Sequence, residues 1–235
     1  MKKEKNDFKN IRRILFLMIC AMLLFLADPA YAEEGDTESG GAAQQEQEGQ
    51  VNGLTAEKQT VRSIQLKWEI TEGVQGYTVY QYHAKSKNWK ELKSLQQNSF
   101  VVRKLKPASV YKFRVAAYRG GGSAKVYLPA SDVLITATVP QKTSLDVTQA
   151  GFYLANYHLR LLICRAKKVK GASGYQYAYS RFRNRKYKTM RTKKLFHRMR
   201  LQKGRVYYFK VRAYKKVGDT YYYGEYSDPK AVRIK

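Results

Sequence analysis

The sequence is poor in the residues from which disulfides, metal sites and acid–base catalysts are built. It has two cysteines, Cys20 and Cys164, and three scattered histidines, His83, His158 and His197, without a carboxylate or cysteine partner at metal-ligand spacing. From residue 51 onward there are nine carboxylates, and no two of them suggest general acid–base chemistry. We therefore predict a protein that is not an enzyme and that needs no metal or other cofactor.

The shortage of acids leaves a formal net charge of +27, and this charge is unevenly spread along the chain. Residues 51–140 hold 14 lysines and arginines against five acids, whereas residues 141–235 hold 25 against four. A surface of one sign attracts polyanions, and the attraction weakens in salt. The last segment should therefore carry any electrostatic binding, unless its charge reflects only composition and solubility.

The first 32 residues have the form of a bacterial export signal. A basic start is followed by the apolar run Ile14–Ala27 and by Ala30-Tyr31-Ala32, a small-x-small cleavage site. The run has 14 residues, which is short for a membrane span of about 20. We expect cleavage after Ala32 and a secreted or surface-exposed bacterial protein. Retention as an anchor is the alternative, and it would give the protein its only contact with a membrane.

Two features of the exported chain follow from this cleavage. Only Cys164 remains, so an internal disulfide is impossible. Dimerisation through Cys164 is an alternative, but its alternating apolar surroundings predict a buried strand position, and we expect a monomer. Residues 33–50 contain six acids and no aliphatic or aromatic side chain larger than alanine. Such a segment cannot bury enough area to offset its ordering entropy, so we predict an acidic, disordered linker.

From residue 51 the chain has the pattern of an all-β protein. Apolar and polar residues alternate in residues 64–68, 111–117 and 207–213, which is typical of strands with one buried face. Turns rich in Gly and Pro separate these runs, including Gly120–Gly122, and no amphipathic helix of useful length is apparent.

The two halves of this region repeat one another. Tyr111 to Tyr118 is seven residues and so is Tyr207 to Tyr214, and further spacings coincide at an offset of 96–98 residues. Both copies also contain a Ser-Asp pair 13 residues after the second tyrosine. We place the domains at residues 51–140 and 141–235, with the boundary near Pro140.

These residues resemble fibronectin type III domains. The matching features are Trp68, the stretches GYTV at 76–79 and GYQY at 174–177, the motif of Leu105, Pro107 and Tyr111, and Leu201 with Tyr207 in the second copy, where Lys203 replaces the usual proline. The stretches KKVKGASGYQ and VRAYKKVGDTYYYG are similar to versions found in secreted proteins of Gram-positive gut bacteria.

The resemblance implies two tandem seven-stranded β-sandwiches. It also implies that the motif tyrosine forms a corner, its hydroxyl bonded to nearby backbone. The residues expected in the structural core are Trp68, Tyr77, Leu105, Tyr111, Tyr175, Leu201 and Tyr207.

The second copy departs from the family pattern at two places. Its tryptophan position is Ala166, and an uncompensated loss of this kind costs ~3–5 kcal/mol, so Tyr177, Tyr179 or Met190 should fill the space. Phe196 and Arg198 occupy the positions that match the inward-facing Phe100 and Val102, so we expect a bulge or a register shift there.

Two basic surfaces are predicted on the second copy. In a strand that starts at Gly174, the alternate tyrosines Tyr175, Tyr177 and Tyr179 face inward, and Gln176, Ala178 and Ser180 face outward. The basic residues beyond them fall in a turn and the next strand, and they can cluster: Arg181, Arg183, Arg185, Lys186, Lys188 and Arg191. The same alternation places Tyr208, Lys210, Arg212 and Tyr214 outward, beside Arg233 and Lys235 on the last strand.

Three functions are compatible with this pattern. The first is a secreted or surface binding and spacer module whose second domain contacts an anionic polymer, either wall teichoic acid or a sulfated host glycan. The second is extracellular nucleic-acid binding, with Tyr208 and Tyr214 as aromatic contacts. The third is structural, in which the domains present the chain at the surface or pair with another surface protein.

Overall fold

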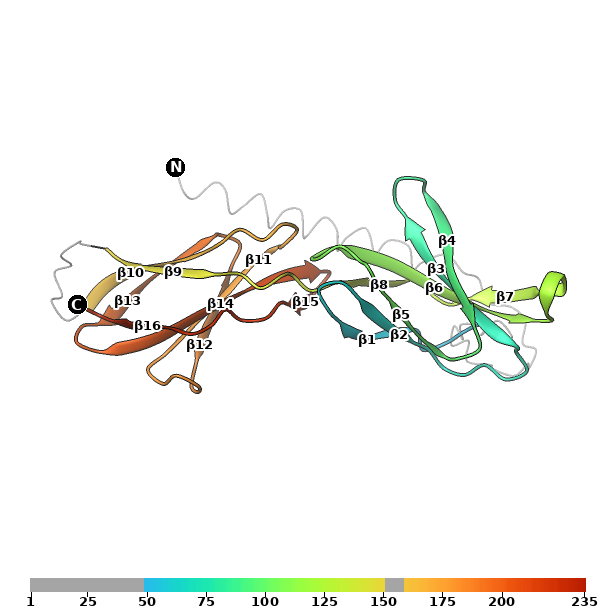
Figure 1. The fold of residues 1–235 in the computed structure, drawn as a ribbon, viewed down its shortest axis with the longest axis horizontal. Helices are drawn as coiled ribbons and strands as arrows, with labels where there is room; N and C mark the ends of the chain where they lie inside the picture. Colours follow the sequence, from blue (N-terminus) through green and yellow to red (C-terminus); the bar gives the residue numbers. More distant parts are fainter. Residues whose placement is uncertain (1–48, 151–158) are drawn as a thin grey trace, which may run out of the picture. The chain divides into compact units, whose positions relative to one another are not determined.

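The computed structural model describes residues 49–150 and 159–235, so the predicted export signal and nearly all of the acidic linker lie outside the described residues. Those ranges contain sixteen β-strands and one short 3-10 helix, η1 (Gly122–Ala124) (Figure 1). The predicted all-β fold is confirmed. No helix in the described part of the chain is long and apolar enough to cross a membrane.

Eight strands form the first sandwich. One sheet has the order β1-β2-β5, and the other has β4-β3-β6-β7 with β8 also paired to β6. The strands are β1 (Thr55–Gln59), β2 (Ile64–Lys67), β3 (Gly76–His83), β4 (Asn88–Leu95), β5 (Ser99–Val102), β6 (Val110–Arg119), β7 (Val126–Ala130) and β8 (Leu134–Ala137). The glycine-rich turn and η1 join β6 to β7, as the sequence predicted.

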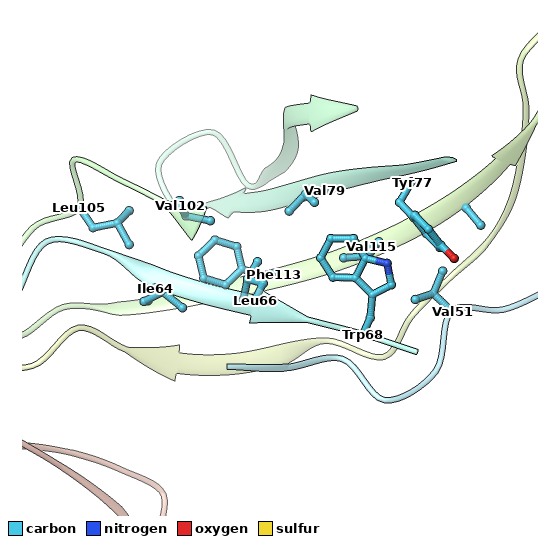
Figure 2. Close-up of a cluster of buried hydrophobic side chains, with 11 residues drawn as sticks. Val51, Ile64, Leu66, Trp68, Tyr77, Val79, Val102, Leu105, Phe113 and Val115 are labelled. Carbon is cyan, nitrogen blue, oxygen red and sulfur yellow. The ribbon is translucent and has the colours of Figure 1, made fainter. Parts of the chain in front are cut away.

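The core of the first sandwich lies between these two sheets (Figure 2). Ile64 and Leu66 of β2 are fully buried opposite Phe113 of β6, because alternate residues of each strand point to the same side. Trp68 follows β2 and contacts Tyr77 edge-on, with 5.5 Å between the ring centroids.

The second sandwich repeats this arrangement. One sheet has the order β9-β10-β13, and the other has β12-β11-β14-β15 with β16 also paired to β14. The strands are β9 (Leu145–Gln149), β10 (Leu159–Ala166), β11 (Gly174–Ser180), β12 (Lys188–Thr192), β13 (Phe196–Gln202), β14 (Val206–Val217), β15 (Thr220–Tyr223) and β16 (Lys230–Arg233). Its core includes the free cysteine Cys164, which is buried as predicted.

The last strand of each sandwich is broken by a buried serine. The Ser131 amide donates to the Val115 carbonyl at 2.7 Å, and the Ser131 hydroxyl accepts from the Val115 amide at 3.0 Å. Ser227 makes the same two bonds with Val211, at 2.7 and 3.1 Å. The side chain thus supplies the acceptor that a continuous strand would provide, which explains the repeated Ser-Asp spacing.

The missing tryptophan of the second sandwich is replaced by Tyr177. Its hydroxyl accepts from the Ala166 amide at 3.1 Å and donates to the Leu195 carbonyl at 2.5 Å. Tyr177 matches Val79 of the first sandwich, so the large and small side chains have exchanged strands. This confirms Tyr177 among the three predicted fillers, and burial raises its pKa.

The inward face of β13 is shifted by one residue, and no bulge accompanies the shift. Its pairing with β10 runs one to one from Leu159 opposite Gln202 to Arg165 opposite Phe196. Met199 and Leu201 pack against the core, and the His197 ring stacks on Tyr177 at 6.0 Å. The expected bulge is therefore wrong and the register shift is right, because a one-residue slip turns Arg198 outward.

Among the expected core residues, six are buried and Tyr111 is partly buried. The tyrosine corner is present at Tyr111, whose hydroxyl accepts from the Lys106 amide at 2.7 Å. No corresponding bond to Tyr207 occurs within the described residues. β13 continues to Gln202, the residue that matches Lys106, and pairs it with Leu159, so that amide lies in a strand rather than a loop.

Candidate anion-binding surface of the second sandwich

The turn between β11 and β12 displays most of the predicted basic cluster. Arg181, Arg183, Arg185 and Lys186 lie in it, all exposed, and Lys188 is the first residue of β12. The buried Ser180 hydroxyl shapes this turn, since it accepts from the Phe182 amide at 3.0 Å and donates to the Arg185 carbonyl at 2.6 Å.

An exposed aromatic ring lies within this turn. Phe182 is 44% exposed, with the Arg185 guanidinium 4.9 Å and the Lys186 ammonium 5.6 Å from its ring centroid. Cations are attracted to the face of such a ring at this distance, which holds the two long side chains together. The turn is therefore a compact group of positive charges around an apolar centre.

The predicted binding cations have no carboxylate partners in the described part of the chain. The three ion pairs of the second sandwich join Lys142 to Asp228, Lys216 to Asp219 and Lys230 to Asp146, at 3.0 to 3.5 Å. The hydrogen bond from Lys230 lowers the Asp146 pKa. None of the nine cations predicted to bind a polyanion is among these pairs, so their charge is not compensated within the sheet.

Three of those cations instead lie in a row of aromatic rings on the outer face of the five-stranded sheet. Arg191 is 4.3 Å from the Tyr221 ring centroid, and Arg212 lies between Tyr223 at 3.9 Å and Tyr226 at 4.4 Å. Lys210 follows, 4.5 Å from Tyr226 and 3.9 Å from Tyr187. We call this row the tyrosine–cation ladder; its members are Arg191, Tyr221, Tyr223, Arg212, Tyr226, Lys210 and Tyr187.

Gln176 fixes the centre of the ladder. Its side-chain oxygen Oε1 accepts from Arg212 Nε at 2.7 Å and from the Tyr226 hydroxyl at 3.0 Å. Arg191 and Arg212 are its cross-strand neighbours on either side. Burial raises the pKa of Tyr226, although Arg212 acts in the opposite direction.

The ladder changes two predictions about the outer face. Gln176, Ala178 and Ser180 face away from the core side of β11, but they are buried rather than solvated. The predicted six-residue cluster also divides, because Arg191 belongs to the ladder, where it donates to the Tyr223 hydroxyl at 3.2 Å.

Tyr214 is wrong as an exposed aromatic contact, since its side chain is only 6% exposed. It lies opposite Gly174, and its hydroxyl occupies the space that the Cβ of any other residue at position 174 would need. Tyr118 covers Gly76 in the first sandwich in the same way. Tyr208 is half-buried and Arg233 is exposed, paired with Val206.

The comparison with protein families agrees with this topology. The sequence model of the fibronectin type III domain matches residues 49–132. Residues 49–132 are thus similar to a fibronectin type III domain. Domains of that family are generally binding or spacer modules without catalytic activity. No curated protein sequence matches the chain.

Solved structures similar to this chain also contain fibronectin type III domains. The chicken CNTN1 FN1–FN3 domains are 16% identical, with 80% of this chain and 68% of that chain covered and a TM-score of 0.44. The two-domain segment from chicken tenascin is 12% identical, with 78% and 99% covered and a TM-score of 0.43.

The first sandwich has a smaller version of the same arrangement on its outer face. Arg114 lies 4.5 Å from the Trp89 ring centroid and 5.5 Å from that of Tyr80. Arg114 matches Lys210 in the repeat, and each contacts an aromatic ring contributed by the β3–β4 or β11–β12 hairpin. A cation held over such a ring is therefore common to both sandwiches.

The tyrosines of the ladder were not identified from the sequence as part of the site, although their spacing contains a signal. Tyr221 and Tyr223 alternate in β15, and Tyr226 precedes the buried serine. Pairing β15 with the outward residues of β14 places Tyr223 opposite Tyr214 and Tyr221 opposite Lys216.

Proposed function

We propose that this chain is a non-enzymatic binding module, exported from a bacterial cell, whose second sandwich binds an anionic polymer. Wall teichoic acid and sulfated glycan are the polymers that its chemistry fits. The observation that carries the proposal is that nine cations of one sandwich have no carboxylate partner in the described ranges. A polyanion would supply the missing counter-charge.

The geometry of the cations supports this proposal in two ways. The basic turn offers exposed guanidinium groups, which can bind phosphate or sulfate through two parallel hydrogen bonds. The ladder holds Arg212 and Lys210 each between two rings and Arg191 over the Tyr221 ring, so less side-chain entropy is lost when a ligand meets them.

A column experiment tests the proposal. The exported chain should be retained on immobilised heparin and on purified teichoic acid, and its retention should fall steeply as salt is raised. Changing Arg181, Arg183 and Arg185 to Glu should weaken retention far more than the same change at Lys85 and Lys87 of the first sandwich. Retention that salt leaves unchanged would contradict the electrostatic mechanism.

Single-stranded nucleic acid is the other polyanion considered, and it needs exposed rings on which bases stack. Tyr214 is buried and the rings of the ladder are already stacked against cations, which favours the glycan or teichoic acid. Loss of binding on Tyr208→Ala together with a preference for single strands would favour nucleic acid. A chain that binds none of these polymers would fit a display module that pairs with another surface protein.

A further inference from the structure

We infer that the second sandwich contains a discrete pocket for one phosphate or sulfate ester of a sugar or polyol. This deepens the proposed function, on which it rests, because a unit of an anionic polymer carries such a group. The pocket has a volume of about 350 Å³ and lies where β11 ends, beside β12 and β13. Volumes of this size hold small ligands.

Four cations line this pocket, and they come from both sheets. Arg181, Lys186 and Lys188 belong to the β11–β12 hairpin of the five-stranded sheet, and Arg200 comes from β13 of the three-stranded sheet. β12 and β13 end their respective sheets, so the pocket lies on the open side between the two sheets.

No carboxylate offsets these four charges. The pocket lining contains no Asp or Glu, and three of the four acids in residues 141–235 are paired with Lys142, Lys216 and Lys230 instead. Four like charges around so small a volume repel one another, and a bound anion would offset this repulsion. A tetrahedral phosphate or sulfate ester group has the negative charge and the acceptor oxygens that such a site requires.

Tyr207 supplies a polar group that none of the described residues uses. In the first sandwich the Tyr111 hydroxyl is occupied by the Lys106 amide, whereas the Tyr207 hydroxyl has no hydrogen bond in the described chain. Its ring is 7% exposed and lines the pocket, so the hydroxyl is available to a ligand there. Tyr179 and Phe182 complete an aromatic wall against which the carbon skeleton of a sugar can pack.

Titration of the exported chain with two small esters tests this inference. Glycerol 3-phosphate and glucosamine 6-sulfate serve as probes, so that the phosphate and sulfate sources of the same chemistry are distinguished. We expect saturable binding of at least one ester by calorimetry or by NMR shifts. The double change Lys188→Gln with Arg200→Gln should weaken it at least about tenfold, because two charge-assisted contacts are lost.

The matched control is Arg183→Gln with Arg185→Gln, which removes the same charge from exposed residues outside the pocket. This variant should keep its affinity for the small ester while its retention on the polymer columns falls. Tyr207→Phe should weaken ester binding about threefold to tenfold and leave the melting temperature unchanged, because the removed hydroxyl makes no bond to residues 49–150 or 159–235.

Each outcome decides between the two proposals. Absence of saturable ester binding, or equal weakening in the two double variants, would overturn the pocket. If the unmodified chain is still retained on the polymer columns in that case, the proposed function survives without the pocket. Saturable ester binding by a protein that no polymer retains would overturn the proposed function and leave the pocket in place.

Discussion

Replacing Arg212 with Ala should destabilise the second sandwich, although the residue lies on its outer face. The change removes two cation–ring contacts, at 3.9 and 4.4 Å, and the 2.7 Å hydrogen bond to Gln176. A cation–ring contact contributes ~0.5–2 kcal/mol and a hydrogen bond from a charged donor ~1.5–3 kcal/mol. Gln176 keeps its bond from the Tyr226 hydroxyl, so its oxygen is not left unpaired.

All three contacts belong to one half-buried side chain, so their contributions do not simply add and lie toward the low end of these ranges. We therefore expect a loss of ~2–4 kcal/mol in the free energy of unfolding of that sandwich. In a domain of this size, a loss of that amount lowers the melting temperature by ~10–25 °C. Both tryptophans, Trp68 and Trp89, lie in the first sandwich. Tryptophan fluorescence thus reports the first sandwich alone, whereas circular dichroism reports both.

Arg212→Ala should lower the temperature of one circular dichroism transition and leave the fluorescence transition in place. Arg114→Ala should shift the fluorescence transition instead, and Arg183→Ala should shift neither, because Arg183 is exposed in the turn. An Arg212→Ala protein that melts like the unmodified chain would refute the reasoning. The contacts of Arg212 with Tyr223, Tyr226 and Gln176 would then contribute nothing measurable to the stability of the second sandwich.

Three further predictions concern the interior. Tyr177→Val should lower the free energy of unfolding, measured in urea, by ~2–4 kcal/mol. Adding Ala166→Trp should recover part of this loss by recreating the pairing of the first sandwich, and a double variant no more stable than either single variant would contradict this. Tyr111→Phe should cost ~1 kcal/mol in the first sandwich, whereas Tyr207→Phe should leave unfolding unchanged, and equal effects would argue against the difference between the two corners. Burial, aided by the charge of Asp146, raises the pKa of Cys164 to about 12. The buried neutral thiol therefore contributes stability that is fully present below the ordinary thiol pKa and is lost as the pH rises from there through the raised pKa of the folded protein. Iodoacetamide labelling of Cys164 near pH 9 should therefore follow unfolding rather than thiol ionisation, and rapid labelling of the folded protein would refute this burial.

The fold was predictable because its main signals are local. Alternation in a strand such as β14 depends on neighbouring residues alone, and it placed Tyr207 and Phe209 inward. Tyr177 could be named as one of three candidates to fill the tryptophan space, because the repeat showed that Ala166 occupies the tryptophan position.

The site was only partly predictable, because its features depend on which strands become neighbours. Tyr214 alternates outward, yet it is buried because Gly174 on the paired strand leaves room for its ring. The ladder requires residues of β12, β14 and β15 to meet on one face, and no single stretch of sequence encodes that meeting. The pocket includes Arg200, Leu201 and Gln202 of β13, the strand for which the sequence left a bulge and a register shift open.

The two sandwiches pair a large with a small core side chain in opposite order: Trp68 with Val79 in the first, and Ala166 with Tyr177 in the second. This difference affects whether the two copies can exchange strands while they fold. Tandem domains on one chain are prone to trade strands and become trapped as intertwined species. Here such an exchange would press an indole against Tyr177 in one hybrid and leave a void between Ala166 and Val79 in the other. The mismatch penalises both hybrids, so each half is steered toward its own partner strands.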